Sequence, residues 1–351
     1  MNKKIILSLS VIGVVAAIAI GGTIAYFSDT ETAKANIISA GTIDIAVNDE
    51  NPWNKTYTDE LKDMKPSQVR YIEFKVENVG TNPARVWKHI GNIVTNDGVN
   101  SEPECTEGNG TWDNATKTCG GSYAAEYNID TVIDYDMYVC LVGGDCAVDN
   151  TTGKPTGTGW NVIVHPADGM TMADIESTWM DLMEWRPANK GLEKNEKIIV
   201  VQSYHMRADT GNWAQGDTLT YNIDLLAQQM NAPEVRSTTL LMENKDTSWQ
   251  VIKGDGKWGV LKYDKTTKAF TFSGYVVDPA IQYKFVHWND PNEVVIDGKQ
   301  NLIPDSTTGY LSFSGTLPSG LKDAKIWLRP QIWSPESNLK TLWEYELIDT
   351  E

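Results

Sequence analysis

The sequence contains few histidines and lacks the short motifs that mark common catalytic sites. Only four of its 351 residues are histidine, and none of them lies in an H-E-x-x-H motif. The usual zinc-protease arrangement of two His ligands and a Glu base is therefore missing. A G-x-S-x-G nucleophile elbow and a G-x-x-x-x-G-K-[ST] phosphate loop are also absent. We therefore expect neither an enzymatic activity nor a cofactor.

Basic residues are scarce relative to acidic ones. Lysine and arginine total 30, against 47 aspartates and glutamates, which gives a formal net charge of −17. Because binding to a phosphate backbone requires a basic surface, this balance argues against nucleic acid as a partner. An acidic surface favours solubility and is compatible with an exported protein.

Long apolar runs are absent except at the N-terminus. Lys3 and Lys4 precede residues 5–28, which carry no charge. The apolar stretch 5–20 has the length of a signal-peptide core, and extension to Tyr26 would just cross a bilayer. We expect residues 1–26 to be a cleaved signal peptide. The alternative is a retained N-terminal anchor, which would be the only contact with a membrane.

Cysteine is rare and occurs in two close pairs. Cys105 and Cys119 form one pair, and Cys140 and Cys146 form the other. In an exported chain, proximity favours two local disulfides, Cys105–Cys119 and Cys140–Cys146, among the three pairings that four cysteines allow. Metal binding is the weaker alternative, because neither spacing is C-x-x-C and no histidine lies nearby.

Two further features suggest sites on the surface. The carboxylates of Asp134 and Asp136 lie two residues apart on a predicted strand and share one face, which suits either calcium or plain solvent exposure. Four N-x-[ST] sequons are candidate N-glycosylation sites, although a Thr-rich chain also produces such triplets by chance. They begin at Asn54, Asn109, Asn114 and Asn150.

The sequence is rich in β patterning. Apolar and polar residues alternate at period two, with Gly, Pro, Asn and Asp between the runs, which predicts an all-β fold over residues 41–230. The main runs span residues 41–47, 68–80, 84–94, 129–144, 196–208 and 217–230. One segment differs: apolar residues at helical spacing, preceded by Thr171 with Asp174 as a capping box, predict one short helix over residues 171–183.

A boundary is expected at residues 231–237, followed by a second β domain over residues 238–351. Short strand-like runs there are separated by turns about every ten residues, a spacing typical of a β-sandwich. Most of the thirteen tryptophans in the chain should lie in cores. Any exposed ones in the second domain would suggest a sugar-binding face.

The stretch "AYFSDTET" followed by "AGTIDI", within residues 25–45, is distinctive. It resembles the N-terminus of the TasA/camelysin (CalY) family of exported biofilm-matrix fibre proteins, which includes archaeal bundling pilins. Residues 64–86 resemble a strand pair of that family, and residues 212–229 resemble its final strand. The resemblance thus covers about residues 1–230.

This resemblance implies a jelly-roll-like β-sandwich and cleavage by a SipW-type signal peptidase between Tyr26 and Phe27. It also implies donor-strand complementation, in which residues 27–40 of one subunit complete the sheet of a copy or a related fibre subunit. In agreement, Phe27, Ala33, Ala35 and Ile37 fall on one apolar face of that segment. The alternatives are that the segment folds back onto its own domain or forms a tether.

These features together predict a secreted, two-domain, all-β structural protein of the cell surface or biofilm matrix. The alternative function is a monomeric adhesin whose C-terminal domain binds polysaccharide or another matrix component. A camelysin-type metallopeptidase is a third class, which would require an unfamiliar ligand set because H-E-x-x-H is absent.

Overall fold

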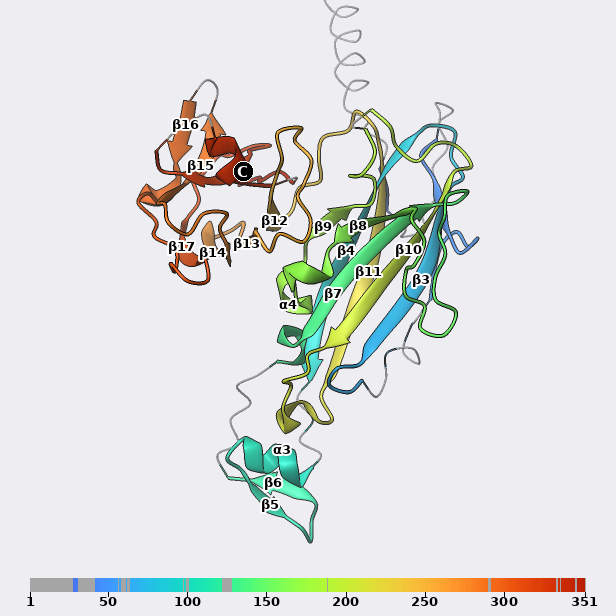
Figure 1. Cartoon of the computed structure of the whole chain (residues 1–351), viewed down its shortest axis with the longest axis vertical. Coiled ribbons are helices and arrows are strands. Elements are labelled where there is room, and N and C mark those ends of the chain that lie inside the picture. The colour runs from blue at the N-terminus through green and yellow to red at the C-terminus, as the bar shows by residue number, and fades with distance from the viewer. Residues whose placement is uncertain are drawn as a thin grey trace, which may run out of the picture.

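The structure is a computed structural model (Figure 1). It describes residues 28–30, 42–55, 57, 61, 64–96, 98, 101–121, 128–187, 189–289, 292–332, 334, 336–344 and 346–350. The signal peptide, the Tyr26–Phe27 cleavage site and the donor residues Ala33, Ala35 and Ile37 therefore lie outside the described residues. Strands dominate what is described, which confirms the all-β fold class. The described part of the chain holds no helix long and apolar enough to span a bilayer.

Two antiparallel sheets form a sandwich in the N-terminal part of the chain (Figure 1). One sheet has the order β1–β11–β4–β9, and the other has the order β2–β3–β10–β7–β8. The strands of the first are β1 (Ser28–Thr30), β4 (Ala84–Asn96), β9 (Trp179–Asp181) and β11 (Thr218–Gln229). Those of the second are β2 (Ile45–Val47), β3 (Val69–Asn78), β7 (Ile133–Leu141), β8 (Trp160–Val164) and β10 (Lys197–Met206).

The alternation seen in the sequence places the apolar residues of both sheets in one core. On β3, Ile72, Phe74 and Val76 are buried and belong to this core, and on β10 Val200 and Tyr204 do the same. Side chains of a strand point alternately to its two faces, so each of these sets lines one inner face of the sandwich.

The helix predicted over residues 171–183 is wrong beyond its first turn. The capping box of Thr171 and Asp174 is present and begins α4 (Met172–Ile175). Glu176 then leaves the helical region with φ −53° and ψ 128°, and Ser177 adopts φ 63°. The chain continues into β9, which pairs with β4. Strand pairing satisfies backbone groups at the edge of β4 that a continued helix would leave without partners.

A small lobe extends from one end of the sandwich (Figure 1). It contains a second helix, α3 (Glu102–Glu107), and the hairpin of β5 (Thr111–Asp113) and β6 (Thr118–Gly120). The Cys105–Cys119 disulfide joins the helix to the hairpin. Short 3-10 turns complete the described elements: η1 (Ile129–Thr131), η2 (Pro166–Asp168), η3 (Asn212–Ala214), η4 (Ile296–Gly298) and η5 (Ser337–Lys340).

The C-terminal part forms one eight-stranded antiparallel sheet of order β16–β15–β18–β19–β12–β13–β14–β17. Rings of Phe270 on β14 and Phe285 on β15 lie 5.3 Å apart although five strand-to-strand steps separate them. The sheet therefore curls around its own core. Its strands are β12 (Thr239–Asn244), β13 (Trp258–Tyr263), β14 (Ala269–Tyr275), β15 (Tyr283–Asn289), β16 (Asn292–Val295), β17 (Tyr310–Thr316), β18 (Ile326–Pro330) and β19 (Leu342–Glu344).

The outer face of this curled sheet packs against the sandwich. Leu241, Trp258 and Val260 belong to the sandwich core cluster rather than to the C-terminal one. Trp258 also donates its indole N–H to the Asp168 carbonyl at 2.8 Å, and Lys262 donates to the Ala173 carbonyl at 2.9 Å. Shared apolar burial and these hydrogen bonds join the two parts.

Candidate functional site

A groove of about 1470 Å³ runs along β11 at the open side of the sandwich. Residues 217–224 form one wall, the segment 53–66 forms the opposite wall, and the ends of β7 and β10 lie at its floor. Typical small-molecule sites are about 300–1,000 Å³. The elongated lining and larger volume suit a segment of polypeptide.

One edge of β11 is only partly paired. On one side, β4 pairs with β11 from residue 218 to residue 229. On the other side, β1 pairs only with residues 226–228. Within the described residues, no strand pairs with residues 218–225 of β11 on this edge. A strand edge of this kind presents backbone donors and acceptors that another strand can pair with.

The direction of β1 is informative. Ser28 pairs with Gln228 and Thr30 pairs with Leu226, so β1 runs antiparallel toward the free part of the β11 edge. This is the arrangement of a segment folded back on its own domain, one of the alternatives expected for residues 27–40. The described contact ends at Thr30, ahead of the predicted donor residues Ala33, Ala35 and Ile37.

The sandwich core is incompletely covered at the groove. Trp53, Leu61, Met64, Leu219 and Tyr221 are partly buried, pack against the core and line the groove. Along β11 the half-buried residues alternate with exposed polar ones. An apolar side chain placed in the groove would therefore lose water contact and cover apolar core surface at the same time.

A chain of hydrogen-bonded polar groups leads from Tyr221 and Tyr204, which line the groove, into the core of the sandwich. Tyr221 donates its hydroxyl to Tyr204 at 2.7 Å, and the rings of Tyr204 and Tyr135 lie 5.5 Å apart. Tyr135 accepts from the Lys88 ammonium at 2.9 Å and donates to the Gln202 amide oxygen at 3.1 Å. These hydrogen bonds fix the ring positions that shape the floor.

Burial controls the ionisation of these groups. It raises the pKa of Tyr135 and of Tyr204, so both phenols are neutral hydrogen-bonding groups at physiological pH. Burial also lowers the pKa of the fully buried Lys88, and the carboxylate of Asp224 opposes that shift.

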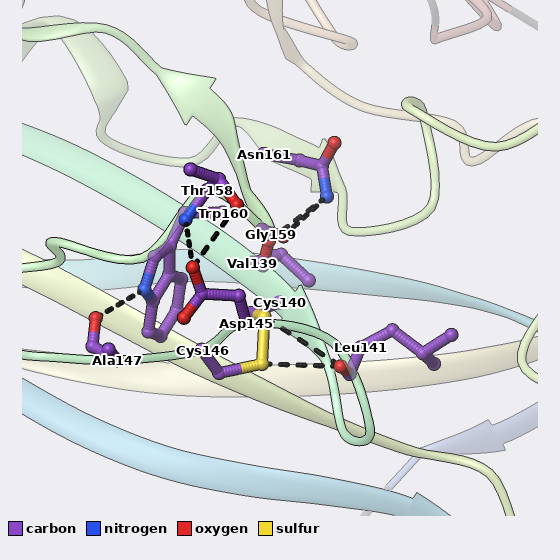
Figure 2. Close-up of a disulfide and its surroundings, with 10 residues drawn as sticks. All are labelled: Val139, Cys140, Leu141, Asp145, Cys146, Ala147, Thr158, Gly159, Trp160 and Asn161. Carbon is purple, nitrogen blue, oxygen red and sulfur yellow. Dashed lines mark hydrogen bonds between the residues drawn. A yellow bond between two sulfur atoms is a disulfide. The ribbon is translucent and has the colours of Figure 1, made fainter.

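The two disulfides join the cysteines that lie close in sequence. Besides Cys105–Cys119, the structure pairs Cys140 with Cys146 at a Cα–Cα distance of 5.7 Å (Figure 2). Asp145, next to the second bridge, accepts hydrogen bonds from the backbone and hydroxyl of Thr158 at 2.9 and 3.1 Å. These bonds lower the pKa of Asp145 and hold the β7–β8 connection in place. Both bridges are compatible with an oxidising, extracellular compartment.

All four sequon asparagines are exposed. Asn109 and Asn114 lie in the disulfide lobe, Asn150 lies in the β7–β8 connection, and Asn54 lies on the wall of the groove. Their glycosylation stays a prediction. A glycan on Asn54 would restrict access to the groove, whereas one in the lobe would not.

The acidic pair on β7 has protein partners. Asp134 pairs with Arg207 at 2.7 Å, and Asp136 accepts the Ser203 hydroxyl at 2.8 Å and pairs with His205. The same imidazole nitrogen of His205 faces both Ser203 and Asp136, and Ser203 is fully buried. A catalytic triad instead uses two different nitrogens and an accessible serine.

Among the described residues, no group of three or more His, Cys, Asp or Glu side chains is arranged to hold a metal ion. Residues 1–96 match the family model described as camelysin metallo-endopeptidase. Over this segment, about a quarter of its length, the chain is similar to the camelysin (TasA) family. No curated protein matches the chain.

The camelysin match confirms the resemblance over residues 1–96, while its predicted extension to about residue 230 stays a prediction. It spans β1 to β4 and includes the groove wall formed by residues 53–66, but not β11. The sequence motifs placed the family resemblance at the N-terminus correctly. They did not locate the groove, because its two walls are brought together by tertiary structure and are separated by about half the chain.

Proposed function

We propose that the chain is an exported structural subunit that joins extracellular fibres by donor-strand complementation. In this proposal, the groove along β11 is the acceptor site, and residues 27–40 of the next subunit are the donor. The observation that carries the proposal is the edge of β11 at residues 218–225, which no described strand pairs with and which lies beside an incompletely covered core. The family of the N-terminal segment also supports it.

The donor segment has the chemistry that this groove accepts. Its backbone would pair with the β11 edge in place of β1 and continue along that edge, satisfying donors and acceptors of both chains. Ala33, Ala35 and Ile37 alternate at period two and would point together into the groove. Full burial of one isoleucine side chain contributes about 1.5–3 kcal/mol. Several such contacts and the ladder would hold adjacent subunits together.

Such a contact joins unlike surfaces of two identical subunits. The N-terminus of one copy meets the groove of another, so each added copy presents a new groove and a new donor. A head-to-tail contact that does not close into a ring produces a filament. The C-terminal domain would then lie along the outside of the fibre as a regular attachment.

The proposal includes export to the cell surface or biofilm matrix. Residues 1–26 would be removed by a SipW-type signal peptidase, which frees Phe27 as the first residue of the donor. The partner would be another copy or a related fibre subunit. In this proposal the chain has no enzymatic activity, and any glycans would occupy the exposed lobe and the β7–β8 connection.

The experiment uses two forms of the chain, one starting at Phe27 and one starting at Gly41. We expect filaments from the first and monomers from the second by negative-stain microscopy. A synthetic peptide of residues 27–40 should bind the shorter form and raise its melting temperature. The same peptide with Ile37→Asp should bind at least about tenfold more weakly, because a charge cannot be buried without a partner.

Two substitutions provide a matched test of the acceptor. Leu219→Lys places a charge on the groove wall, whereas Val94→Lys places one on an exposed position of β4. We expect only the first to abolish filaments. Filaments from the form starting at Gly41, or equal binding of both peptides, would refute donor-strand assembly. Zinc-dependent proteolysis by the purified chain would favour the peptidase class instead.

A further inference from the structure

Four tryptophans form a continuous row on the C-terminal domain. The ring centroids of Trp288 on β15 and Trp327 on β18 lie 5.7 Å apart. Trp343 on β19 lies 5.0 Å from Trp327 and 5.0 Å from Trp249, which belongs to the loop after β12. Trp288 is 42% exposed and Trp249 is 55% exposed, while Trp343 is buried. The row is thus open to solvent at both ends and well packed at its centre.

The row lies on the face of the sheet that is turned away from the C-terminal core. Ile326 and Leu328, the sequence neighbours of Trp327, are buried in that core, so Trp327 points to the other face. Across the sheet, Trp343 pairs with Glu243, and Glu243 pairs with Trp258, which packs on the sandwich. In Figure 1, β15 and β16 lie on the side of the domain away from the sandwich. The sandwich therefore covers one part of this face, and the tryptophan row occupies another.

Trp249 is held in an unusual backbone conformation. Its φ is 63°, in the left-handed region that favours glycine and is rare for a bulky residue. The Asp246 carboxylate fixes the loop by accepting the backbone N–H groups of Ser248 at 2.8 Å and Gln250 at 2.9 Å. Exposure of a large aromatic ring on a strained backbone gives little benefit to folding. Strain of this kind is often found where a side chain serves binding.

Charged residues flank the row. They form ion pairs with acidic residues of the same domain or of the segment just before it. Lys325 and Arg329 lie two residues before and after Trp327, on the same face of β18. Each forms ion pairs, so the borders are polar but nearly balanced in charge. The pairs are Lys284–Glu293, Arg329–Glu293, Lys325–Glu234 and Lys325–Glu344.

We propose that this tryptophan row binds a neutral polysaccharide. The C–H groups on a pyranose ring form an apolar face that packs on the electron-rich face of an aromatic ring, while its hydroxyls point outward to polar groups. A narrow aromatic strip with balanced polar borders matches that amphipathic shape. A protein partner would usually contact a broad apolar patch at the centre of its interface, whereas a polysaccharide does not need one. The net charge of −17 also disfavours anionic polysaccharides.

The ring orientations refine the class of ligand. Trp343 lies at 65° to Trp249 and at 62° to Trp327, and Trp288 lies at 40° to Trp327. The rings therefore do not share a plane, so they cannot lie together against a flat crystalline surface. We expect single, soluble chains to bind in preference to crystalline polymer. This binding is independent of fibre assembly and would attach each subunit to matrix carbohydrate.

The test is native affinity electrophoresis of the chain starting at Phe27 and of the monomeric form starting at Gly41. The gels contain hydroxyethylcellulose, laminarin, soluble starch, galactomannan or the anionic polymer alginate. We expect at least one neutral polymer to retard both forms. Alginate should retard neither. Trp288→Ala should weaken the apparent affinity about tenfold or more. A pull-down with crystalline cellulose should recover little protein.

Trp249→Gly separates a binding role from a structural one. Glycine relieves the left-handed strain, so we expect an unchanged or higher melting temperature together with at least about tenfold weaker binding. Trp112→Ala, on the disulfide lobe, is the matched control and should bind normally. The proposal is wrong if no neutral polymer retards the chain, or if the row variants bind as tightly as the parent. It is equally wrong if only alginate binds.

Discussion

The sandwich and the C-terminal domain close their cores in different ways. The C-terminal sheet curls until Phe270 and Phe285 touch, so strands that are distant in the sheet enclose one core. The sandwich leaves its core partly covered beside β11, where Leu219 and Tyr221 are only half-buried. A curled sheet can thus complete itself, whereas a sandwich with a partly paired edge strand gains stability from an added strand. In our proposals, assembly therefore uses the first region and carbohydrate binding uses the second.

The largest effect is expected in the self-contained core. Phe272 is fully buried, and its ring lies 5.0 Å from that of Phe313. Phe272→Ala should reduce the free energy of unfolding by about 3–5 kcal/mol, because it leaves a cavity that neighbouring strands cannot fill. Chemical denaturation measures this value. Phe272→Leu, as a control, should cost about 1.5 kcal/mol or less. A loss below about 1 kcal/mol for the alanine variant would show that this core is not closed.

An intermediate effect concerns the buried acids where the two regions meet. Burial raises the pKa of Glu184 to about 8 and that of Glu344 to about 7. It also raises the pKa of Glu346 well above its ordinary value of 4.5, and both carboxylate oxygens of Glu346 are buried without a hydrogen-bond partner. Lys253 pairs with Glu184 and Glu243, and Lys325 pairs with Glu344.

The sign of the pH dependence follows from these shifts. The folded chain holds protons on these acids that the unfolded chain releases above about pH 4.5. Their contribution to stability is therefore greatest below that pH and is lost as the pH rises through 7–8. Calorimetry should give a lower melting temperature at pH 8.5 than at pH 5.5. Glu346→Gln should stabilise the chain at pH 8.5 by about 1–3 kcal/mol and change little at pH 5. An equal effect at both pH values would contradict a protonated Glu346.

The smallest effect on stability is expected at the groove. In the form starting at Gly41, Leu219→Ala should cost about 1 kcal/mol or less, because that side chain is already partly in water. The same variant should bind the peptide of residues 27–40 about tenfold more weakly by calorimetric titration. Unchanged peptide binding would mean that the donor does not contact this wall.

Much of the fold could be predicted from local pattern. The runs 68–80 and 84–94 correspond to β3 and β4, and the run 217–230 corresponds to β11. Period-two alternation succeeds there because one face of each strand is buried and the other is not. The predicted helix failed after Ile175, since Met180 and Leu182 reach the core equally well from a strand paired to β4.

The candidate sites were less accessible to prediction. Trp249, Trp288, Trp327 and Trp343 are separated by up to 94 positions, and only the order of strands in the sheet brings their rings together. The groove similarly depends on the pairing of β11 with β4 from residue 218 to residue 229 on one side, while on the other side the described residues pair with residues 226–228 alone. Sequence alternation states which face of a strand is apolar, but not which neighbour covers it.

The three-residue strand β1 also has a consequence for the time before assembly. An exposed strand edge can pair with any extended chain. A protein that is exported before it assembles must therefore limit such nonspecific pairing. β1 covers the end of the β11 edge that leads into the groove, and among the described residues it does so through Ser28, Asp29 and Thr30 alone. A cover this short can be exchanged for a competing strand by breaking few hydrogen bonds. β1 therefore limits nonspecific pairing at this edge, and a well-matched strand can still displace it.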